Sequence, residues 1–341
     1  MPVAAAIFGC AGPRLSPDER AFFSDARPWG FILFARNVET PDQVRGLVED
    51  MRGCVGRPDA PVLIDQEGGR VQRLGPPHWR RYPPGRAYGL LAERDPRAGR
   101  ETAWLGARLM ADDLAKLGIN VDCLPVLDVP QSGAHDVIGD RAYGETPDRV
   151  AALGRAAAEG LMAGGVLPVV KHIPGHGRAQ ADSHLALPVV DAALADLGAR
   201  DFAPFRALSD MPMAMTAHVV YSAIDPQTPA TTSRRVIETI VRGAIGFDGL
   251  LMSDDLSMKA LSGDFAERAR ASLAAGCDML LHCNGDMAEM KAVMDGGGPL
   301  SGRAEARADA ALARIVRAPE PFDAEAGRAR FDTALQGIWT P

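Results

Sequence analysis

The stretch AGGVLPVVKH, residues 163–172, decides the fold. Its two glycines end a segment of helical composition, because glycine suits the left-handed position that closes a helix. The apolar run Leu167–Lys171 that follows is typical of a buried parallel strand. A basic pair, Lys171 and His172, stands where this run ends. The stretch therefore predicts a helix end, a strand and a polar strand terminus in direct succession.

The same succession recurs along the whole chain, where short apolar runs alternate with Ala-, Leu-, Arg- and Glu-rich segments of helical periodicity. The runs that we predict as strands are Val3–Phe8, Gly30–Phe34, Pro61–Asp65, Asn120–Leu127, Leu167–Lys171, Met213–Ala217, Leu250–Ser253 and Met279–His282. Glycine precedes several of them, as Gly118, Gly246 and Gly276 do. Alternating strands and helices imply right-handed βαβ units and a parallel sheet.

About eight such units predict a single α/β domain over residues 1–341, a (β/α)₈ barrel of the TIM type with some irregular strands. An open doubly wound sheet is the alternative. The first predicted strand, however, is followed by GCAGP at residues 9–13, which lacks the glycine fingerprint of a dinucleotide-binding fold. From about residue 299 to 341 we expect a helical tail packed on the barrel.

Composition narrows the classes of function. The 341 residues are 47% hydrophobic and 24% charged, and the formal net charge of −7 argues against binding to nucleic acid. The start of the chain carries no basic segment, and no apolar run reaches the roughly 18 residues that span a bilayer. We expect a cytoplasmic monomer without membrane insertion. The five cysteines lack a C-x-x-C pair and are expected to be reduced thiols.

Polar residues follow most of the predicted strands, at the end where barrel enzymes place their active sites. They are Asp65 and Glu67 after the third strand, Asp128 after the fourth, Lys171 and His172 after the fifth, His218 after the sixth, Asp254 and Asp255 after the seventh, and His282 and Asn284 after the eighth. Folding alone does not require such a set on one rim.

Asp254 stands in LLMSDDLSM, residues 250–258. A carboxylate at the end of a buried strand is held rigidly and is partly desolvated, which suits a nucleophile or a stabiliser of a cationic centre. The competing interpretation is a helix N-cap, since serine and aspartate ahead of Leu256 would cap a following helix. One residue of the pair Asp254 and Asp255 can cap while the other reacts.

Asp182 and His184 lie two residues apart in a loop of small residues. Asp182 can hold an imidazole N–H and fix its tautomer, which leaves the other nitrogen free to move a proton; the alternative is a solvated pair without function. His176, between two glycines, can pin its loop by hydrogen bonds. Lys171 and His172 can donate to ligand oxygens, or Lys171 can pair with a carboxylate inside the barrel.

Asp65, Arg73 and Arg141 complete the candidate set. Gly68 and Gly69 permit a sharp turn or a close approach of the backbone to a ligand. Arg141 stands in a glycine-flanked loop after the fourth predicted strand.

Three motifs together resemble glycoside hydrolase family 3. They are DQEGGRVQR at residues 65–73, KHIPGHG at 171–177 with DSH at 182–184, and SDDLSM at 253–258. More narrowly, they resemble the family's single-domain bacterial β-N-acetylglucosaminidases of peptidoglycan recycling, and the DSH element points to that branch. The resemblance runs from about Gly30 to about Asn284. Ile173 stands where the family often carries phenylalanine, a difference expected to alter packing and not chemistry.

The resemblance implies a role for each matching residue. Asp254 matches a nucleophile that forms a covalent glycosyl-enzyme, and His184, assisted by Asp182, matches the acid/base. The residues that match those holding the terminal N-acetylglucosamine are Asp65, Arg73, Arg141, Lys171 and His172. Glu67, His176 and Met258 lie in the same motifs and are expected to support the site.

The implied function is a retaining exo-enzyme that cleaves N-acetylglucosamine from anhydro-muropeptides without a metal or a cofactor. Most retaining glycosidases use two carboxylates, and larger relatives are thought to take their acid/base from a second domain, for which this chain has no room. The alternatives are a phosphorylase on the same scaffold, a metal-dependent barrel hydrolase using His172, His176, His184 and Asp254, and a sugar-binding barrel that has lost catalysis.

Overall fold

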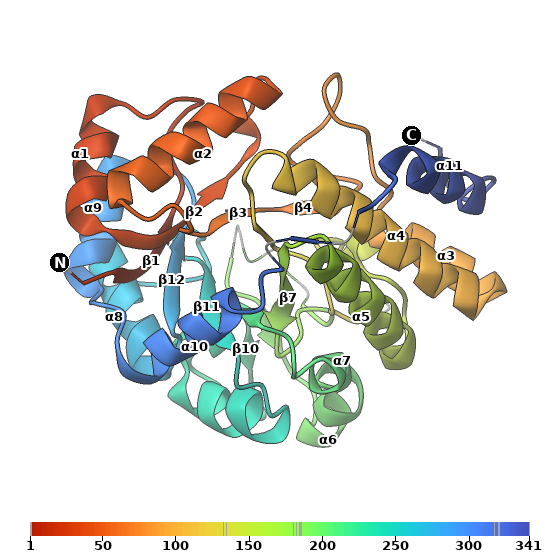
Figure 1. Cartoon of the computed structure of the whole chain (residues 1–341). Coiled ribbons are helices and arrows are strands. Elements are labelled where there is room, and N and C mark those ends of the chain that lie inside the picture. Colours follow the sequence, from red (N-terminus) through yellow and green to blue (C-terminus); the bar gives the residue numbers. More distant parts are fainter. Residues whose placement is uncertain are drawn as a thin grey trace.

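The computed structural model describes residues 2–131, 133, 135–179, 181, 183, 186–316, 318–319 and 321–340. Eight parallel strands close into a barrel in the order β1-β12-β11-β9-β7-β6-β3-β2, with the helices around it (Figure 1). These strands are β1 (Ala4–Phe8), β2 (Pro28–Leu33), β3 (Val62–Ile64), β6 (Val121–Asp122), β7 (Leu167–Ile173), β9 (Met213–Thr216), β11 (Leu250–Asp255) and β12 (Met279–His282). Each predicted strand is present, and the predicted barrel is confirmed.

Helices fill the connections between the strands. They are α1 (Pro17–Ala26), α2 (Pro41–Val55), α3 (Gly85–Arg94), α4 (Pro96–Ala115), α5 (Pro147–Ala163), α6 (Leu194–Asp196), α7 (Ala203–Ala207), α8 (Phe265–Ala275), α9 (Met287–Gly296), α10 (Gly302–Leu312) and α11 (Ala324–Ala334). Short 3₁₀ segments are η1 (Ala35–Asn37), η2 (Gly139–Arg141) and η4 (Ala230–Thr232), and π-helical segments are η3 (Leu197–Asp201) and η5 (Val236–Ala244). Two small sheets, β4 (Gln66–Gly68) with β5 (Val71–Gln72) and β8 (Val189–Val190) with β10 (Val220–Tyr221), lie outside the barrel.

Glycine separates helix from strand as the sequence predicts. Gly118, Gly165, Gly246 and Gly276 have φ angles of 78°, 80°, 78° and 115°, in the left-handed region. A side chain is strained there, whereas glycine is not. Each glycine therefore ends a helical segment and turns the chain toward the next barrel strand.

The barrel interior is packed with alternate residues of each strand, because successive side chains of a strand point to opposite faces. The inward side chains are Ala5, Ile7, Trp29, Ile32, Leu63, Val121, Leu167, Val169, Met213, Met215, Leu250, Met252, Met279 and Leu281, which form one buried cluster. Ala308 and Ala311 of α10 belong to the same cluster. Helix α10 therefore covers the end of the barrel at which the strands begin.

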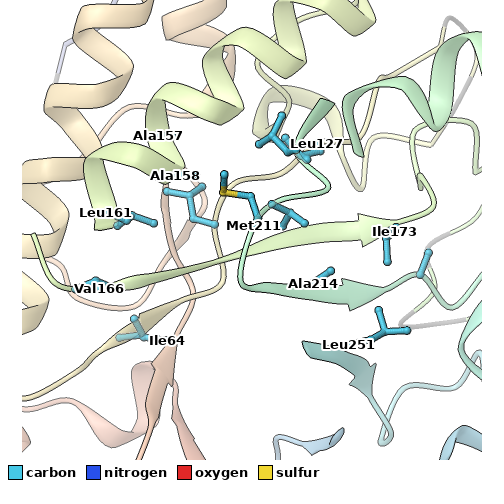
Figure 2. Close-up of a cluster of buried hydrophobic side chains, with 14 of the residues drawn as sticks. Ile64, Leu127, Ala157, Ala158, Leu161, Val166, Ile173, Met211, Ala214 and Leu251 are labelled. Atoms are coloured by element: carbon cyan, nitrogen blue, oxygen red, sulfur yellow. The ribbon is translucent and has the colours of Figure 1, made fainter. Parts of the chain in front are cut away.

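The outward side chains of the strands pack against the helices in a second buried layer. Figure 2 shows part of this layer, with side chains of α5, including Leu161, beside those of β7, β9 and β11. Ile173, at the end of β7, is fully buried in the same layer. The residue that departs from the family pattern thus contributes to packing outside the barrel.

The last two helices pack on the barrel assembly. Helix α11 lies against α4 (Figure 1). The ring of Phe331 in α11 packs edge-on against Tyr82 and at a tilt against Tyr88, each with ring centroids 6.2 Å apart. In the part of the chain that the structure describes, no helix has the length and apolar character to cross a membrane.

The packing of α5 against α4 gives a test of the fold. A Cβ at Gly160 in α5 would lie 2.2 Å from the carbonyl oxygen of Trp104 in α4, whereas a Cβ at the exposed Gly46 in α2 meets nothing within 4 Å. We expect Gly160→Ala to lower the free energy of unfolding by about 1–3 kcal/mol through overpacking. Gly46→Ala, the matched control, should raise it by about 0.5–1 kcal/mol. Urea unfolding of both variants checks the pair, and equal effects would contradict the packing.

Candidate active site

Charged residues continue the inward series of three barrel strands. Asp65 follows β3, and Lys171 and Asp254 lie near the ends of β7 and β11, each two residues beyond the last inward apolar side chain. Their side chains therefore turn toward the barrel axis at the carboxyl end of the barrel. The layer that would otherwise close the apolar interior is polar at this point.

These residues line a cavity of about 280 Å³, near the small end of the range for small-molecule sites. Its polar lining comprises Asp65, Glu67, Arg73, Arg141, Lys171, His172, His176, Ser183, Asp254 and Asp255. Its apolar lining includes Ile32, Phe34, Val137, Met215 and Met258. The described residues that were predicted as nucleophile, sugar-binding or supporting residues therefore all lie in one cavity.

The Lys171 ammonium is the centre of the polar layer. Its Nζ lies 2.8 Å from Asp65 Oδ1 and 2.6 Å from Glu67 Oε1, while the side chain is only 2% exposed. Of the two interpretations from the sequence, pairing with carboxylates inside the barrel is the one observed, and the side chain also borders the cavity.

Two arginines complete what we call the ion network, namely Asp65, Glu67, Arg73, Arg141 and Lys171. Arg141 donates from Nε and Nη2 to the two oxygens of Glu67, both at 2.8 Å. Arg73 Nη2 donates to Asp65 Oδ2 at 2.9 Å. The paired geometry of Arg141 fixes the plane of the Glu67 carboxylate.

The ion network keeps its members charged in spite of burial. Burial raises the pKa of Glu67, but Arg141 and Lys171 outweigh burial and lower this pKa to about 2. Burial likewise raises the pKa of Asp65, and Lys171 and Arg73 reverse the sign and hold it below its usual range. Burial lowers the pKa of Lys171, which Asp65 and Glu67 raise above its ordinary value. Both carboxylates are thus ionised at neutral pH.

A small hairpin delivers Glu67 and Arg73 to this site. Gln66 Oε1 accepts the amides of Arg73 and Leu74, both at 3.0 Å, and so folds β5 back over β4. Gly68 has φ of 94°, and a Cβ there would lie 2.3 Å from the carbonyl oxygen of Pro83. The glycine pair predicted from the sequence therefore serves a sharp turn against a neighbouring segment.

Asp128, which follows β6, binds both His172 and His176. The sequence did not reveal this role. Its Oδ2 lies 2.7 Å from His172 Nδ1, and its Oδ1 accepts the amides of His172 and His176 at 3.2 and 2.6 Å. A carboxylate on Nδ1 requires a proton there, so it fixes the tautomer and leaves the Nε2 edge toward the cavity. Burial raises the pKa of Asp128, but His172 outweighs it and the net pKa is lowered.

His176 makes the loop contact expected of it. Its Nε2 lies 3.2 Å from the hydroxyl of Ser183, and both residues are buried. Ser183 was not among the predicted residues, although it is the central residue of DSH. Asp182 and His184, the predicted acid/base pair, lie outside the described residues.

Asp254 and Asp255 do not cap a helix. The next helix, α8, begins at Phe265 and is capped by Asp264. Asp255 instead closes a turn, accepting from the Ser257 hydroxyl and from the Cys283 amide at 3.1 Å. The N-cap interpretation is therefore wrong, and Asp254 faces the cavity as the end of a rigid strand.

Two other histidines of the predicted rim, His218 and His282, are not among the residues that line the cavity. His218 donates and accepts within the wall, with Nδ1 2.7 Å from Thr231 Oγ1 and Nε2 3.0 Å from the carbonyl oxygen of Asp255. His282 Nε2 lies 2.9 Å from Glu289 Oε2. These histidines therefore support the strand ends and do not line the site.

For the metal alternative, the described ranges contain no group of three His, Cys, Asp or Glu residues arranged to hold a metal ion. One ring nitrogen of each described histidine of this alternative is engaged within the protein, His172 Nδ1 with Asp128 and His176 Nε2 with Ser183.

The sequence and the structure both match known glycosidases. A family model described as the glycosyl hydrolase family 3 N terminal domain matches residues 11–318. A beta-hexosaminidase of Methylococcus capsulatus is 46% identical over 283 residues, 82% of this chain and 82% of that protein. A beta-hexosaminidase of Alkalilimnicola ehrlichii is 42% identical over 282 residues, 82% of this chain and 80% of that protein.

Among solved structures, NagZ from Neisseria gonorrhoeae is similar with a TM-score of 0.85 and 34% identity, covering 100% of this chain and 99% of that chain. A family 3 β-N-acetylglucosaminidase from a Paenibacillus species has a TM-score of 0.85 and 31% identity, covering 97% of this chain and 66% of that chain.

The ion network predicts a pH-dependent stability. The pKa of Glu67 is lower in the folded state than in the unfolded state. Its contribution to the free energy of unfolding is therefore complete above the unfolded pKa near 4.5 and is lost as pH falls toward 2. We expect Glu67→Gln to cost about 3 kcal/mol at pH 7 and clearly less at pH 3. Urea unfolding at both pH values measures this difference. The control Asp112→Asn removes an exposed pair with Lys116 and should cost under about 1 kcal/mol; a pH-independent loss for Glu67→Gln would contradict the network.

Proposed function

Because the chain belongs to glycosyl hydrolase family 3, we propose that this glycoside hydrolase is a retaining exo-β-N-acetylglucosaminidase. It releases the terminal non-reducing N-acetylglucosamine of anhydro-muropeptides, in the recycling of the cell wall. The beta-hexosaminidase names of its relatives support the sugar. The observation that carries the proposal is the shared cavity, in which Asp254, the ion network and Ser183 all take part.

The ion network and His172 hold the sugar. Asp65, Arg73, Arg141, Lys171 and His172 offer charge-assisted hydrogen bonds to hydroxyl groups, which are stronger than neutral ones. Arg73 and Arg141 both line the cavity, so their guanidinium groups border the space in which a sugar would bind. A cavity of about 280 Å³ suits one terminal sugar, which favours exo cleavage.

The reaction takes two steps. A carboxylate oxygen of Asp254 attacks C1 of the sugar, the bond from C1 to the leaving oxygen breaks, and His184 gives its proton to that oxygen. Water then attacks C1 and loses a proton to His184, and the bond from C1 to Asp254 breaks. Two inversions at C1 restore the β configuration.

The carboxylates of the cavity favour a histidine as the acid. An acid must carry its proton near neutral pH, yet cations hold the pKa of Glu67 at about 2 and that of Asp65 below its usual range. Asp255 is engaged with Ser257 and Cys283. In the described part of the cavity wall, therefore, none of these three carboxylates suits proton donation.

We assign the role of proton donor to His184. Ser183, the residue between Asp182 and His184 in the sequence, lines the cavity, which supports this assignment. An imidazole donates and accepts near pH 7 without the raised pKa that a glutamate needs. Asp182 holds one ring nitrogen of His184 and stabilises the imidazolium.

Removal of either reacting group tests the assignment. We expect Asp254→Asn to lower kcat/KM on an aryl β-N-acetylglucosaminide by about 10⁴-fold or more, because no covalent intermediate forms. His184→Ala should cost about 10²–10⁴-fold. Both are measured by release of the phenol, beside Asp309→Asn, the same change at an exposed position of α10, which should keep full activity. Wild-type turnover by Asp254→Asn would overturn the mechanism.

Product analysis separates hydrolysis from phosphorolysis. NMR of the first product from a muropeptide fragment should show β-N-acetylglucosamine, because two displacements retain configuration. The result should not change when phosphate is added. Sugar 1-phosphate as the main product would favour the phosphorylase, and the α anomer would exclude a covalent intermediate.

A further inference from the structure

His176 lines the cavity, but the proposed reaction gives it no step. Its imidazole is 3% exposed, and its Nε2 lies 3.2 Å from Ser183 Oγ. A buried polar side chain costs free energy unless its hydrogen bonds are made, so a fixed contact in this position calls for a purpose.

The main chain around His176 is held from three directions. The His176 amide donates to Asp128 Oδ1 at 2.6 Å, and the Tyr221 hydroxyl donates to the carbonyl oxygen of Gly175 at 2.6 Å. A Cβ at Gly177 would lie 2.1 Å from the carbonyl oxygen of Val129, so the backbone there is pressed against the segment after β6. These contacts fix the main chain that carries the His176 imidazole.

Ser183 is tied to the barrel at two points. Its hydroxyl meets His176, and its carbonyl oxygen accepts the amide of Ala260 at 3.2 Å. Ala260 lies six residues beyond Asp254, in the segment that follows β11. Ser183 therefore joins the loop after β7 to the loop after the strand that carries Asp254.

We propose that His176 is a positioning residue: its hydrogen bond fixes Ser183, the residue between the proposed acid/base pair Asp182 and His184, in the wall of the cavity. The inference rests on the proposed function. Effective proton transfer requires a donor within hydrogen-bond reach of the leaving oxygen, and a displacement of 1 Å lowers rates steeply. Ser183, as the residue between the acid/base pair, is the natural point at which to fix it.

The protonation state of His176 allows its hydrogen bond to Ser183 to persist at physiological pH. Burial lowers its pKa to about 4, so the ring is neutral across the physiological range. A neutral imidazole has one donor and one acceptor nitrogen, and a serine hydroxyl can pair with either. The hydrogen bond does not change as His184 gains and loses its proton.

Substrates whose leaving groups differ in acidity can show whether the proposed acid, His184, is misplaced. An alcohol leaves only with a proton, whereas an acidic phenol leaves without one. We expect His176→Leu and Ser183→Ala to lower kcat/KM on N,N′-diacetylchitobiose by about 10–100-fold, and on a dinitrophenyl β-N-acetylglucosaminide by less than about 3-fold. His176→Gln, whose amide can still bond Ser183, should restore most of the loss.

The control is His78→Leu, the same change at an exposed histidine, which should leave both substrates unaffected. Circular dichroism and thermal unfolding establish that each variant is folded; if His176→Leu is not, Ser183→Ala and His176→Gln decide. Equal losses on both substrates, or no loss on either, would overturn the positioning role. If Asp254→Asn is inactive in the same assays, the proposed function stands even when the role of His176 fails; no hydrolysis by the wild-type protein would remove both.

Discussion

The ammonium of Lys171 is the constraint on which the site depends. A buried cation is tolerated only with partners, and breaking a buried ion pair costs about 3–5 kcal/mol. Lys171 meets Asp65 and Glu67 at 2.8 and 2.6 Å, which joins β7 to β3 and to the hairpin beside it. Glu67 carries the chain of contacts on to Arg141 in η2. Lys171 occupies an inward position of β7 that would otherwise be apolar. Its charge thus holds the surrounding loops together at the base of the cavity.

The ion network also brings a surplus of positive charge to the cavity wall. Lys171, Arg73 and Arg141 contribute three positive charges, and Asp65 and Glu67 contribute two negative ones, so the network carries one net positive charge. It also leaves paired, oriented donors for hydroxyl groups, which need no reorganisation when a sugar binds.

Much of this arrangement follows from the sequence by alternation. The eight apolar runs gave the strands, and counting in steps of two from Leu63, Val169 and Met252 leads to Asp65, Lys171 and Asp254. The same count places His218 and His282 on the outward face, although proximity to strand ends had put them on the rim. The pairing of Glu67 with Arg141, 74 residues apart, and the contacts of Asp128 depend on loop paths that no local pattern encodes.

Asp128 shows why those loop paths matter to the chemistry. One of its oxygens orients the His172 ring, and the other takes the His176 amide, from which the imidazole reaches Ser183. A single buried carboxylate, that of Asp128, therefore binds both His172, which is expected to hold the sugar, and His176, which is proposed to support the acid/base segment. The relative placement of these two residues is constrained, because both bind the same carboxylate group. If the proton donor comes from the loop after β7, as we propose, its support and a residue expected to hold the sugar share one buried anchor.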